Sequence, residues 1–142
     1  MFKPSKRTLD NLVGVHPKLV QVILEGYKYA EVDYGVVAKA VRTQAEQDDL
    51  YAQGRTKPGK IVTWTTQSKH IPGKDGLGHA VDVTAFLNGQ PSWQDDLYHP
   101  IIWAIKTAAE DLHVKIECGI DWKKPDFGHV QLADGYKDAR YV

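Results

Sequence analysis

Three separated segments of this sequence carry histidines and acids of the types that bind metal ions. The first is Ser68-Lys69-His70, the second runs from Gly78 to Asp82, and the third is Asp126-Phe127-Gly128-His129. Together they offer imidazoles and a carboxylate from distant positions, with a further carboxylate three residues before the last histidine. A catalytic zinc needs three nitrogen or oxygen ligands, an open fourth position for water and a nearby base. The three segments therefore predict a catalytic zinc site.

A structural zinc would leave a different pattern, because it is closed by four ligands that usually include several cysteines. This chain has one cysteine, Cys118, which also excludes an internal disulfide. Cys118 follows the apolar alternation of Val114 and Ile116, so we expect a small buried hydrophobic residue rather than a reactive thiol.

Spacing alone does not decide which histidine of the first two segments binds the metal. His79 and Asp82 are close enough to chelate one ion, although side chains three apart on a strand point to opposite faces. Asp82 stands in the apolar stretch Val81-Asp82-Val83, where a carboxylate is costly to bury unless it binds a cation. Three other histidines are expected at helix ends, where none of them needs a metal: His16, His99 and His113.

The combined pattern resembles a family of zinc peptidases that includes D-alanyl-D-alanine carboxypeptidases and the L-alanyl-D-glutamate endopeptidases used as phage endolysins. The resemblance rests on His70 standing two residues after Ser68, on the segment ending at Asp82, and on Asp126-x-x-His129. It also includes Val41–Gln47, Leu50–Thr56 and Gly119–Lys123, and so covers about residues 36 to 132.

The resemblance implies a role for each member of the set. It implies three zinc ligands: His70, Asp82 and His129. It makes Asp126 the base that takes a proton from water and later delivers it to the leaving amine, with Glu117 and Asp121 as nearby alternatives. His79 is expected at the rim of the site, where it or a backbone amide would donate a hydrogen bond to the oxyanion.

Four further residues are expected to bind substrate. Arg42 and Gln47 match family positions that hold substrate, and a guanidinium grips a carboxylate through two parallel hydrogen bonds. Peptidoglycan stem peptides carry such carboxylates, although spacing alone would make Arg42 an ordinary surface arginine. Ser68 stands two residues before His70, and Trp122 stands beside Asp121 and close to the third segment, so we expect both to line the cleft.

One segment departs from the family pattern. The first histidine and the glycine usually stand three apart in the family, whereas His70 and Gly78 stand eight apart. The segment Ile71–Leu77 therefore contains an insertion of about five residues, rich in turn-forming Pro72, Gly73 and Gly76. We predict that it forms a mobile flap at the edge of the cleft.

The apolar patterning predicts an α+β fold, with helices packed on a small antiparallel sheet. The resemblance implies the hedgehog or D,D-peptidase type of this fold. Helices are expected from Pro17 to Tyr27, from the capping box at Thr43 to Gly54, and from Pro100 to Leu112. Strands are expected at residues 32–36, 61–66, 80–86, 114–117 and 130–132.

Length, charge balance and the lengths of the apolar runs limit the classes of partner and location that the sequence supports. The 142 residues suit a single catalytic domain spanning 1–142, and 18 basic residues balance 18 acidic ones, which gives no argument for nucleic acid. No apolar run has the length of a signal peptide core or a membrane span. We therefore expect a monomer that is made in the host cytoplasm and acts on the cell wall after release across the inner membrane.

The function that the resemblance favours is hydrolysis of the L-alanyl-D-glutamate bond in peptidoglycan by a zinc enzyme of the phage endolysin kind. A D-alanyl-D-alanine carboxypeptidase or dipeptidase on the same scaffold is the alternative among enzymes. An inactive module that binds the wall is a third possibility, which the intact set of His70, Asp82, His129 and Asp126 argues against.

Overall fold

The computed structural model describes residues 1–133, and the fold over these residues is α+β, as predicted. Its α-helices are α1 (Lys6–Asn11), α2 (Pro17–Glu25), α3 (Gln44–Ala52) and α4 (Asp95–Asp111), with 3-10 turns η1 (Gly26–Lys28) and η2 (Gly119–Asp121). Its strands are β1 (Asp33–Gly35), β2 (Ala80–Asp82), β3 (Thr84–Leu87), β4 (Gln90–Ser92), β5 (Ile116–Cys118) and β6 (His129–Leu132).

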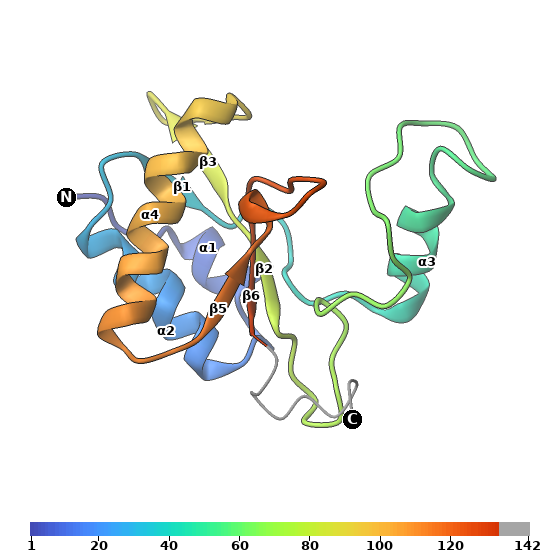
Figure 1. Cartoon of the computed structure of the whole chain (residues 1–142), viewed down its shortest axis with the longest axis horizontal. Coiled ribbons are helices and arrows are strands. Elements are labelled where there is room, and N and C mark those ends of the chain that lie inside the picture. Colours follow the sequence, from blue (N-terminus) through green and yellow to red (C-terminus); the bar gives the residue numbers. More distant parts are fainter. Residues whose placement is uncertain (134–142) are drawn as a thin grey trace.

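Most of these elements form one body, which we define as α1, α2, α4 and the six strands. The strands make two three-stranded antiparallel sheets, in the orders β1-β3-β4 and β2-β6-β5. Figure 1 shows α2 and α4 side by side, with the β2-β6-β5 sheet next to them. Between these layers lies an apolar core that includes Leu19, Ile23, Ile105 and Leu132, all fully buried. Burial of this surface holds the body together.

The helix ends follow local sequence signals. Pro17 is the first residue of α2, as predicted, and the His16 imidazole caps this helix by accepting a hydrogen bond from the backbone N–H of Lys18. The predicted start of the last helix at Pro100 is wrong, because α4 begins five residues earlier, at Asp95. Asp95 and Asp96 lie in its first turn, where their negative charges interact favourably with the helix dipole. Because the helix starts this early, His99 and Pro100 lie inside it and not at its entrance.

The strand predictions need two corrections. The expected strand at residues 80–86 is interrupted at Val83, so β2 and β3 belong to different sheets. The expected strand at residues 61–66 is absent, and this segment is an exposed loop. Cys118 is buried at the end of β5, as predicted, and burial raises the pKa of its thiol to about 11.

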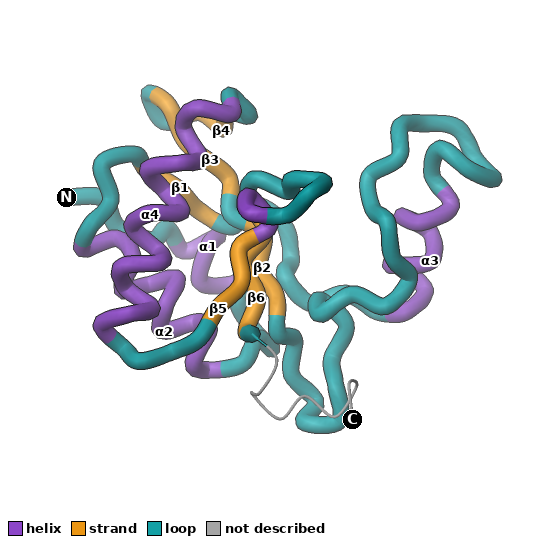
Figure 2. Tube along the Cα trace, in the orientation of Figure 1, coloured by secondary structure: helices purple, strands orange, loops and turns teal. Residues whose placement is uncertain are grey.

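Residues 43–67 project from the body as a separate arm that consists of α3 and the loop after it (Figures 1 and 2). The predicted capping box is present, because the Thr43 hydroxyl accepts from the Glu46 N–H while the Glu46 carboxylate accepts from the Thr43 N–H. The loop then runs back along α3. Three glutamine side chains, two in α3 and one at its C-cap, donate hydrogen bonds to the backbone of this loop. Their amides donate from Gln44 to Thr66 O, from Gln47 to Thr65 O and from Gln53 to Lys60 O. These side-chain bonds take the place of the pairing that a strand would need.

The inserted segment at residues 71–77 folds into a hydrogen-bonded turn. The N–H of Gly76 donates to Gly73 O, and the N–H of Leu77 donates to the Asp75 carboxylate. None of these residues lines the large cleft between the body and the arm, so the predicted flap at the cleft edge is wrong. Within residues 1–133, no helix is long and apolar enough to cross a membrane.

Candidate metal centre and active-site cleft

Two of the predicted ligands come from neighbouring strands of the body. Asp82 at the end of β2 lies directly opposite His129 at the start of β6, so both side chains share one face of the sheet. The Asp82 Oδ1 and His129 Nδ1 atoms are 3.1 Å apart. The two segments stay close just beyond this pair, where the Val83 N–H donates to Gly128 O. A Cβ at Gly128 would lie 2.2 Å from the Val83 carbonyl oxygen, so this close approach requires glycine.

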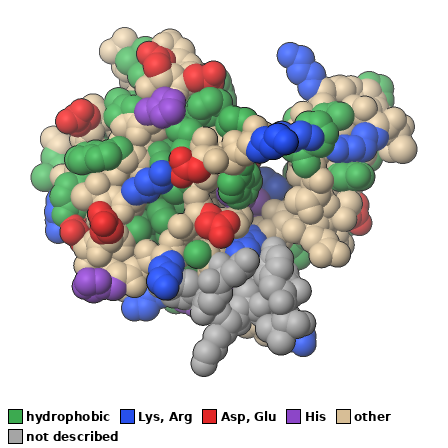
Figure 3. Space-filling view, viewed as in Figure 1, with side chains coloured by type: hydrophobic (Ala, Val, Ile, Leu, Met, Phe, Trp, Pro, Cys, Tyr) green, Lys and Arg blue, Asp and Glu red, His purple; other side chains and the backbone are tan. Residues whose placement is uncertain are grey.

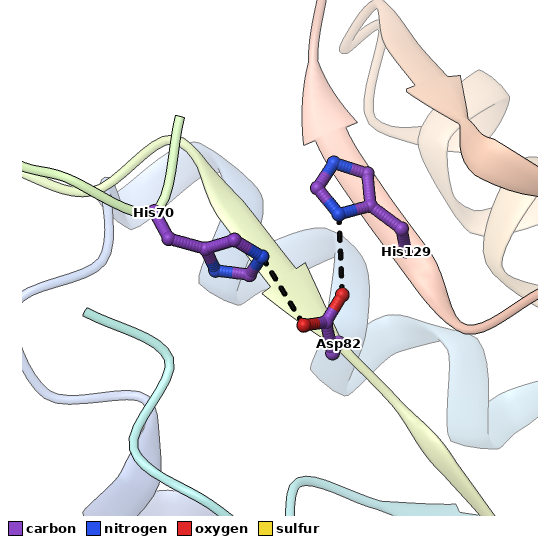
Figure 4. A group of neighbouring side chains, drawn as sticks. All are labelled: His70, Asp82 and His129. Atoms are coloured by element: carbon purple, nitrogen blue, oxygen red, sulfur yellow. Dashed lines mark hydrogen bonds and ion pairs between the residues drawn. The ribbon is translucent and has the colours of Figure 1, made fainter. Parts of the chain in front are cut away.

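The third predicted ligand comes from the chain as it returns from the arm. The His70 carbonyl accepts from the Arg42 N–H, and the preceding Lys69 carbonyl accepts from the His79 N–H. The His70 ring donates from Nδ1 to the Ala40 carbonyl oxygen at 2.8 Å, which leaves Nε2 facing Asp82 Oδ2 at 3.2 Å. Figure 4 shows the two imidazoles on either side of the Asp82 carboxylate.

This arrangement has the donor set that zinc uses. One ligand atom from each of His70, Asp82 and His129 lies within 4.8 Å of the others, and all three face the cleft side of the sheet. Two imidazole nitrogens and one carboxylate oxygen leave a fourth tetrahedral position open, as in catalytic zinc sites. The residues therefore fit a zinc ion.

The outer partners of the ligands also suit a metal. When the neutral His129 ring donates from Nε2 to the Gln131 Oε1 atom, 2.8 Å away, its Nδ1 atom keeps the lone pair that a metal ion would need. The Gln131 amide in turn donates to Glu117 on β5 at 3.1 Å. Such partners fix the tautomer and orientation of a ligating histidine. Sequence reasoning missed Gln131, although its alternation with His129 on one strand placed both on the same face.

The charges in the site reinforce one another. Desolvation alone would raise the pKa of the Asp82 carboxyl, but the positive charge of His70 and the hydrogen bonds from both histidines hold that pKa well below its usual value. Burial lowers the pKa of His129, and its contact with Asp82 more than offsets this, so the net shift is upward. Asp82 therefore stays ionised, as a metal ligand must.

Asp126 lies at the edge of the same centre. Its Oδ2 atom is 3.9 Å from His129 Nδ1, and 57% of its side chain is exposed to the cleft. Its backbone N–H donates to Gly119 O, and a Cβ on Gly119 would lie 2.5 Å from the Asp126 carbonyl oxygen. Desolvation raises the pKa of the Asp126 carboxyl, and the negative charge of Asp82 adds to the shift. A raised pKa suits a group that must accept and release a proton.

The two alternative bases point elsewhere. Asp121 forms an exposed ion pair with Lys106 at 2.7 Å, and Glu117 accepts from Gln131. Neither of these acids lines the cleft, whereas Asp126 does.

A cleft of about 1080 Å³ opens over the metal centre, and Figure 3 shows the surface hollowed between the body and the arm. Three of the predicted substrate residues line it: Arg42, Ser68 and Trp122. Ser68 is largely buried, and its hydroxyl accepts from the His70 N–H. The Trp122 ring lies 5.0 Å from the His129 ring, centroid to centroid.

The other two predicted substrate residues do not line the cleft. Gln47 is fully buried at the base of the arm, where its Oε1 atom accepts from the Arg42 guanidinium at 2.9 Å. His79 is also fully buried, with its Nε2 atom 2.6 Å from the Asp75 carboxylate in the inserted turn. Both residues instead support segments that carry site residues: Gln47 orients Arg42, and the His79 N–H donates to the Lys69 carbonyl.

Comparison with known proteins identifies the family. A family model described as phage L-alanyl-D-glutamate peptidase matches residues 1–142. The chain belongs to this family of peptidases. The resemblance drawn from the histidine and acid segments is thereby confirmed.

Individual relatives of the peptidase family agree with this assignment. The L-alanyl-D-glutamate peptidase of Escherichia phage T5 is 28% identical over 99% of this chain and 96% of its own length. The peptidoglycan L-alanyl-D-glutamate endopeptidase CwlK of Bacillus subtilis is 30% identical over 83% of this chain and 73% of its own. The crystal structure of the Serratia marcescens L-Ala D-Glu endopeptidase ChiX matches with a TM-score of 0.76 and 34% identity, over 92% and 90% of the two chains.

Proposed function

We propose that this chain is a zinc-dependent peptidase that hydrolyses the L-alanyl-D-glutamate bond of peptidoglycan stem peptides. The observation that carries the proposal is the convergence of His70, Asp82 and His129 beneath an open cleft, in a chain whose relatives bear that activity in their names. We further propose that residues 1–142 act as one catalytic domain and as a monomer, and that the wall of a phage host is the target.

The proposed chemistry divides between the ion and the side chains. Zinc, when bound by His70, Asp82 and His129, supplies a Lewis acid that polarises the scissile carbonyl and lowers the pKa of water. Asp126 takes a proton from the attacking water and returns it to the nitrogen of the leaving D-glutamyl group. Gln131 and the Ala40 carbonyl keep the two imidazoles in the tautomers that ligation needs.

Arg42 is proposed to hold the substrate. Its guanidinium already lies 3.2 Å from Asp82 Oδ2 and lines the cleft, so a substrate carboxylate placed there would sit next to the reacting bond. The D-glutamyl residue carries a free α-carboxylate on the carbon that is bonded to the scissile nitrogen. A guanidinium that grips this group orients the peptide as well as binding it.

Mass spectrometry of purified peptidoglycan after digestion tests the proposal. We expect fragments with a new N-terminal D-glutamate, and a chelator should abolish their release. Release of D-alanine instead would show carboxypeptidase activity and overturn the assigned bond.

Metal analysis tests the ligands separately. The variants His70→Ala, Asp82→Ala and His129→Ala should each lose the zinc that the wild type holds at about one ion per chain. His113→Asn is the matched control, because His113 is exposed beyond α4 and has a positive φ that asparagine tolerates. Zinc retained at full stoichiometry by all three ligand variants would refute the site.

A further inference from the structure

Tryptophans surround the cleft without being covered. Trp64, Trp93 and Trp122 line it, and each leaves more than a third of its surface exposed. Exposure alone assigns no role, since Trp103 is 56% exposed away from the cleft. An indole that lines a cleft, however, offers a ligand a broad apolar face, and the steps assigned to the zinc ligands and to Asp126 use none of these three rings.

Trp122 has a special place among them. Its ring lies 5.0 Å from the His129 ring at an angle of 44°, and 38% of the residue is exposed. An aromatic face therefore borders the metal centre directly. The Trp64 ring, by contrast, lies out on the arm and is covered on one face by the Lys124 ammonium, 3.6 Å from its centroid.

Arg42 and Trp122 border the metal centre through different ligands, Arg42 at Asp82 and Trp122 at His129. Arg42 and His70 face its Oδ2 atom, whereas His129, with Trp122 against it, faces Oδ1. On the proposed function, Arg42 holds the carboxylate of the D-glutamyl residue that leaves. The other half of the substrate, which begins with L-alanine, then extends toward Trp122.

The chemistry of the substrate determines which group lies beyond L-alanine on that side. In peptidoglycan, the amino group of L-alanine is acylated by the lactyl group of N-acetylmuramic acid, so one residue separates the scissile carbonyl from the glycan. An extended residue spans about 3.5 Å, which brings the sugar within roughly 7 Å of the reacting bond. One face of a pyranose ring presents C–H groups that pack well on an indole.

We propose that Trp122 is a platform for the muramic acid sugar, and that this glycan contact contributes to the preference for the bond next to L-alanine. The inference rests on the proposed function. It adds a carbohydrate subsite to a site otherwise built for a peptide.

Two synthetic substrates that differ only in the sugar test the proposal. One is N-acetylmuramoyl-L-alanyl-γ-D-glutamyl-L-lysine, and the other carries an N-lactoyl group in place of N-acetylmuramoyl. Wild type should cleave the muramoyl substrate with a kcat/KM about tenfold higher, the factor expected for one stacked contact. In Trp122→Ala this ratio should fall to near one, and Trp122→Phe should keep part of it.

The ratio separates a sugar contact from general damage. Loss of support for the His129 ring would slow both substrates alike and cancel in the ratio. Trp103→Ala is the matched control, because Trp103 is exposed on α4 and does not line the cleft, and its ratio should equal that of the wild type. A ratio that falls in Trp93→Ala but not in Trp122→Ala would move the platform and overturn the assignment.

The outcomes distinguish the two proposals. If wild type cleaves both substrates between alanine and glutamate at equal kcat/KM, the sugar platform is refuted and the peptidase assignment stands. If neither is cleaved at that bond, the proposed function itself fails. Should Trp122→Ala not fold, NMR titration of wild type with N-acetylmuramoyl-L-alanine replaces it. The Trp122 indole N–H should then shift far more than with N-lactoyl-L-alanine, and equal shifts would refute the platform.

Discussion

Different interactions order the body and the arm of this molecule. The body encloses side chains with no exposed surface, such as Leu19, Ile23 and Ile105. The arm leaves its apolar residues Ile61 and Val62 about half exposed, and the residue that it buries completely is a glutamine, Gln47. Apolar burial therefore orders the body, whereas bonds from side-chain amides to backbone carbonyls order the arm.

The proposed site lies where these two regions meet. Asp82 and His129 come from paired strands of the body, so their separation is fixed by sheet register. Arg42 leads into the arm and is oriented by Gln47, while His70 comes directly after the arm's return. The body should therefore govern metal binding and proton transfer, and the arm should govern how substrate is held. Substitutions in each region test this division.

The largest effect is expected at Asp126, the proposed general base, which belongs to the body. Asp126→Asn keeps the size of the side chain but cannot accept a proton, so kcat should fall by about two to four orders of magnitude with zinc content unchanged. Arg42→Ala, at the base of the arm, should act mainly on KM. Steady-state kinetics on one soluble muropeptide would measure both.

Asp121→Asn is the control for Asp126, since Asp121 is an exposed acid in the same loop that does not line the cleft. Its rate should stay near that of the wild type. Full activity in Asp126→Asn with zinc bound would show that the proton acceptor is another group.

Stability should respond next most strongly, and only in the body. Ile105→Ala removes buried methyl groups from the core and should lower the free energy of unfolding by about 2–5 kcal/mol. Ile61→Ala makes the same change in the arm, where the side chain is 42% exposed, and should cost about 0.5 kcal/mol or less. Urea denaturation compares the two, and equal losses would mean that the arm has a core of its own.

The outer partner of His129 should affect the metal more than the fold. Gln131→Leu leaves the His129 Nε2–H without its acceptor, so we expect zinc affinity to fall by about 10–100-fold. Competition with a chromogenic chelator measures this affinity. Equal affinity in Gln131→Leu and wild type would remove Gln131 from the site.

A local effect on hydrogen exchange is expected at Gln47, whose side chain bonds both to the loop of the arm and to Arg42. Gln47→Leu removes the bond from the Gln47 amide to the Thr65 carbonyl and the acceptor of Arg42 Nη1, which costs about 1–3 kcal/mol. We expect amide hydrogen exchange at residues 61–67 to accelerate about tenfold or more, while exchange in α4 stays unchanged. Gln44→Leu breaks only exposed bonds, to Thr66 O and to the Asp48 carboxylate, and should have a smaller effect. Accelerated exchange throughout the body would show that arm and body unfold together.

Sequence patterns predicted the parts of the fold whose signals are local. Pro17 marked the start of α2, Thr43 and Glu46 marked the start of α3, and the α+β class followed from apolar periodicity. These helix signals lie within short segments, so neighbouring residues are enough to indicate them. The proposed ligand set came instead from the family resemblance, because spacing alone left His70 and His79 open.

The failed predictions concern interactions between distant segments. The β-branched run at 61–66 looked like a strand, but α3 glutamines bind its backbone instead. His79 was expected at the rim of the site, yet its ring is buried against the ring of His16, which is distant in sequence, at 5.2 Å between centroids, and does not line the cleft. The prediction also placed the inserted turn at the cleft edge, because sequence spacing does not reveal which end of β2 faces the site.

Anomalous diffraction at the zinc edge from crystals of the zinc-loaded protein tests the proposed metal centre most directly. We predict one peak at the junction of body and arm, about 2.0–2.2 Å from His70 Nε2, an Asp82 carboxylate oxygen and His129 Nδ1. The Gln131 amide should still accept from His129 Nε2 in that structure. A peak beside Asp75 and His79, or ligation of zinc through His129 Nε2, would contradict this assignment.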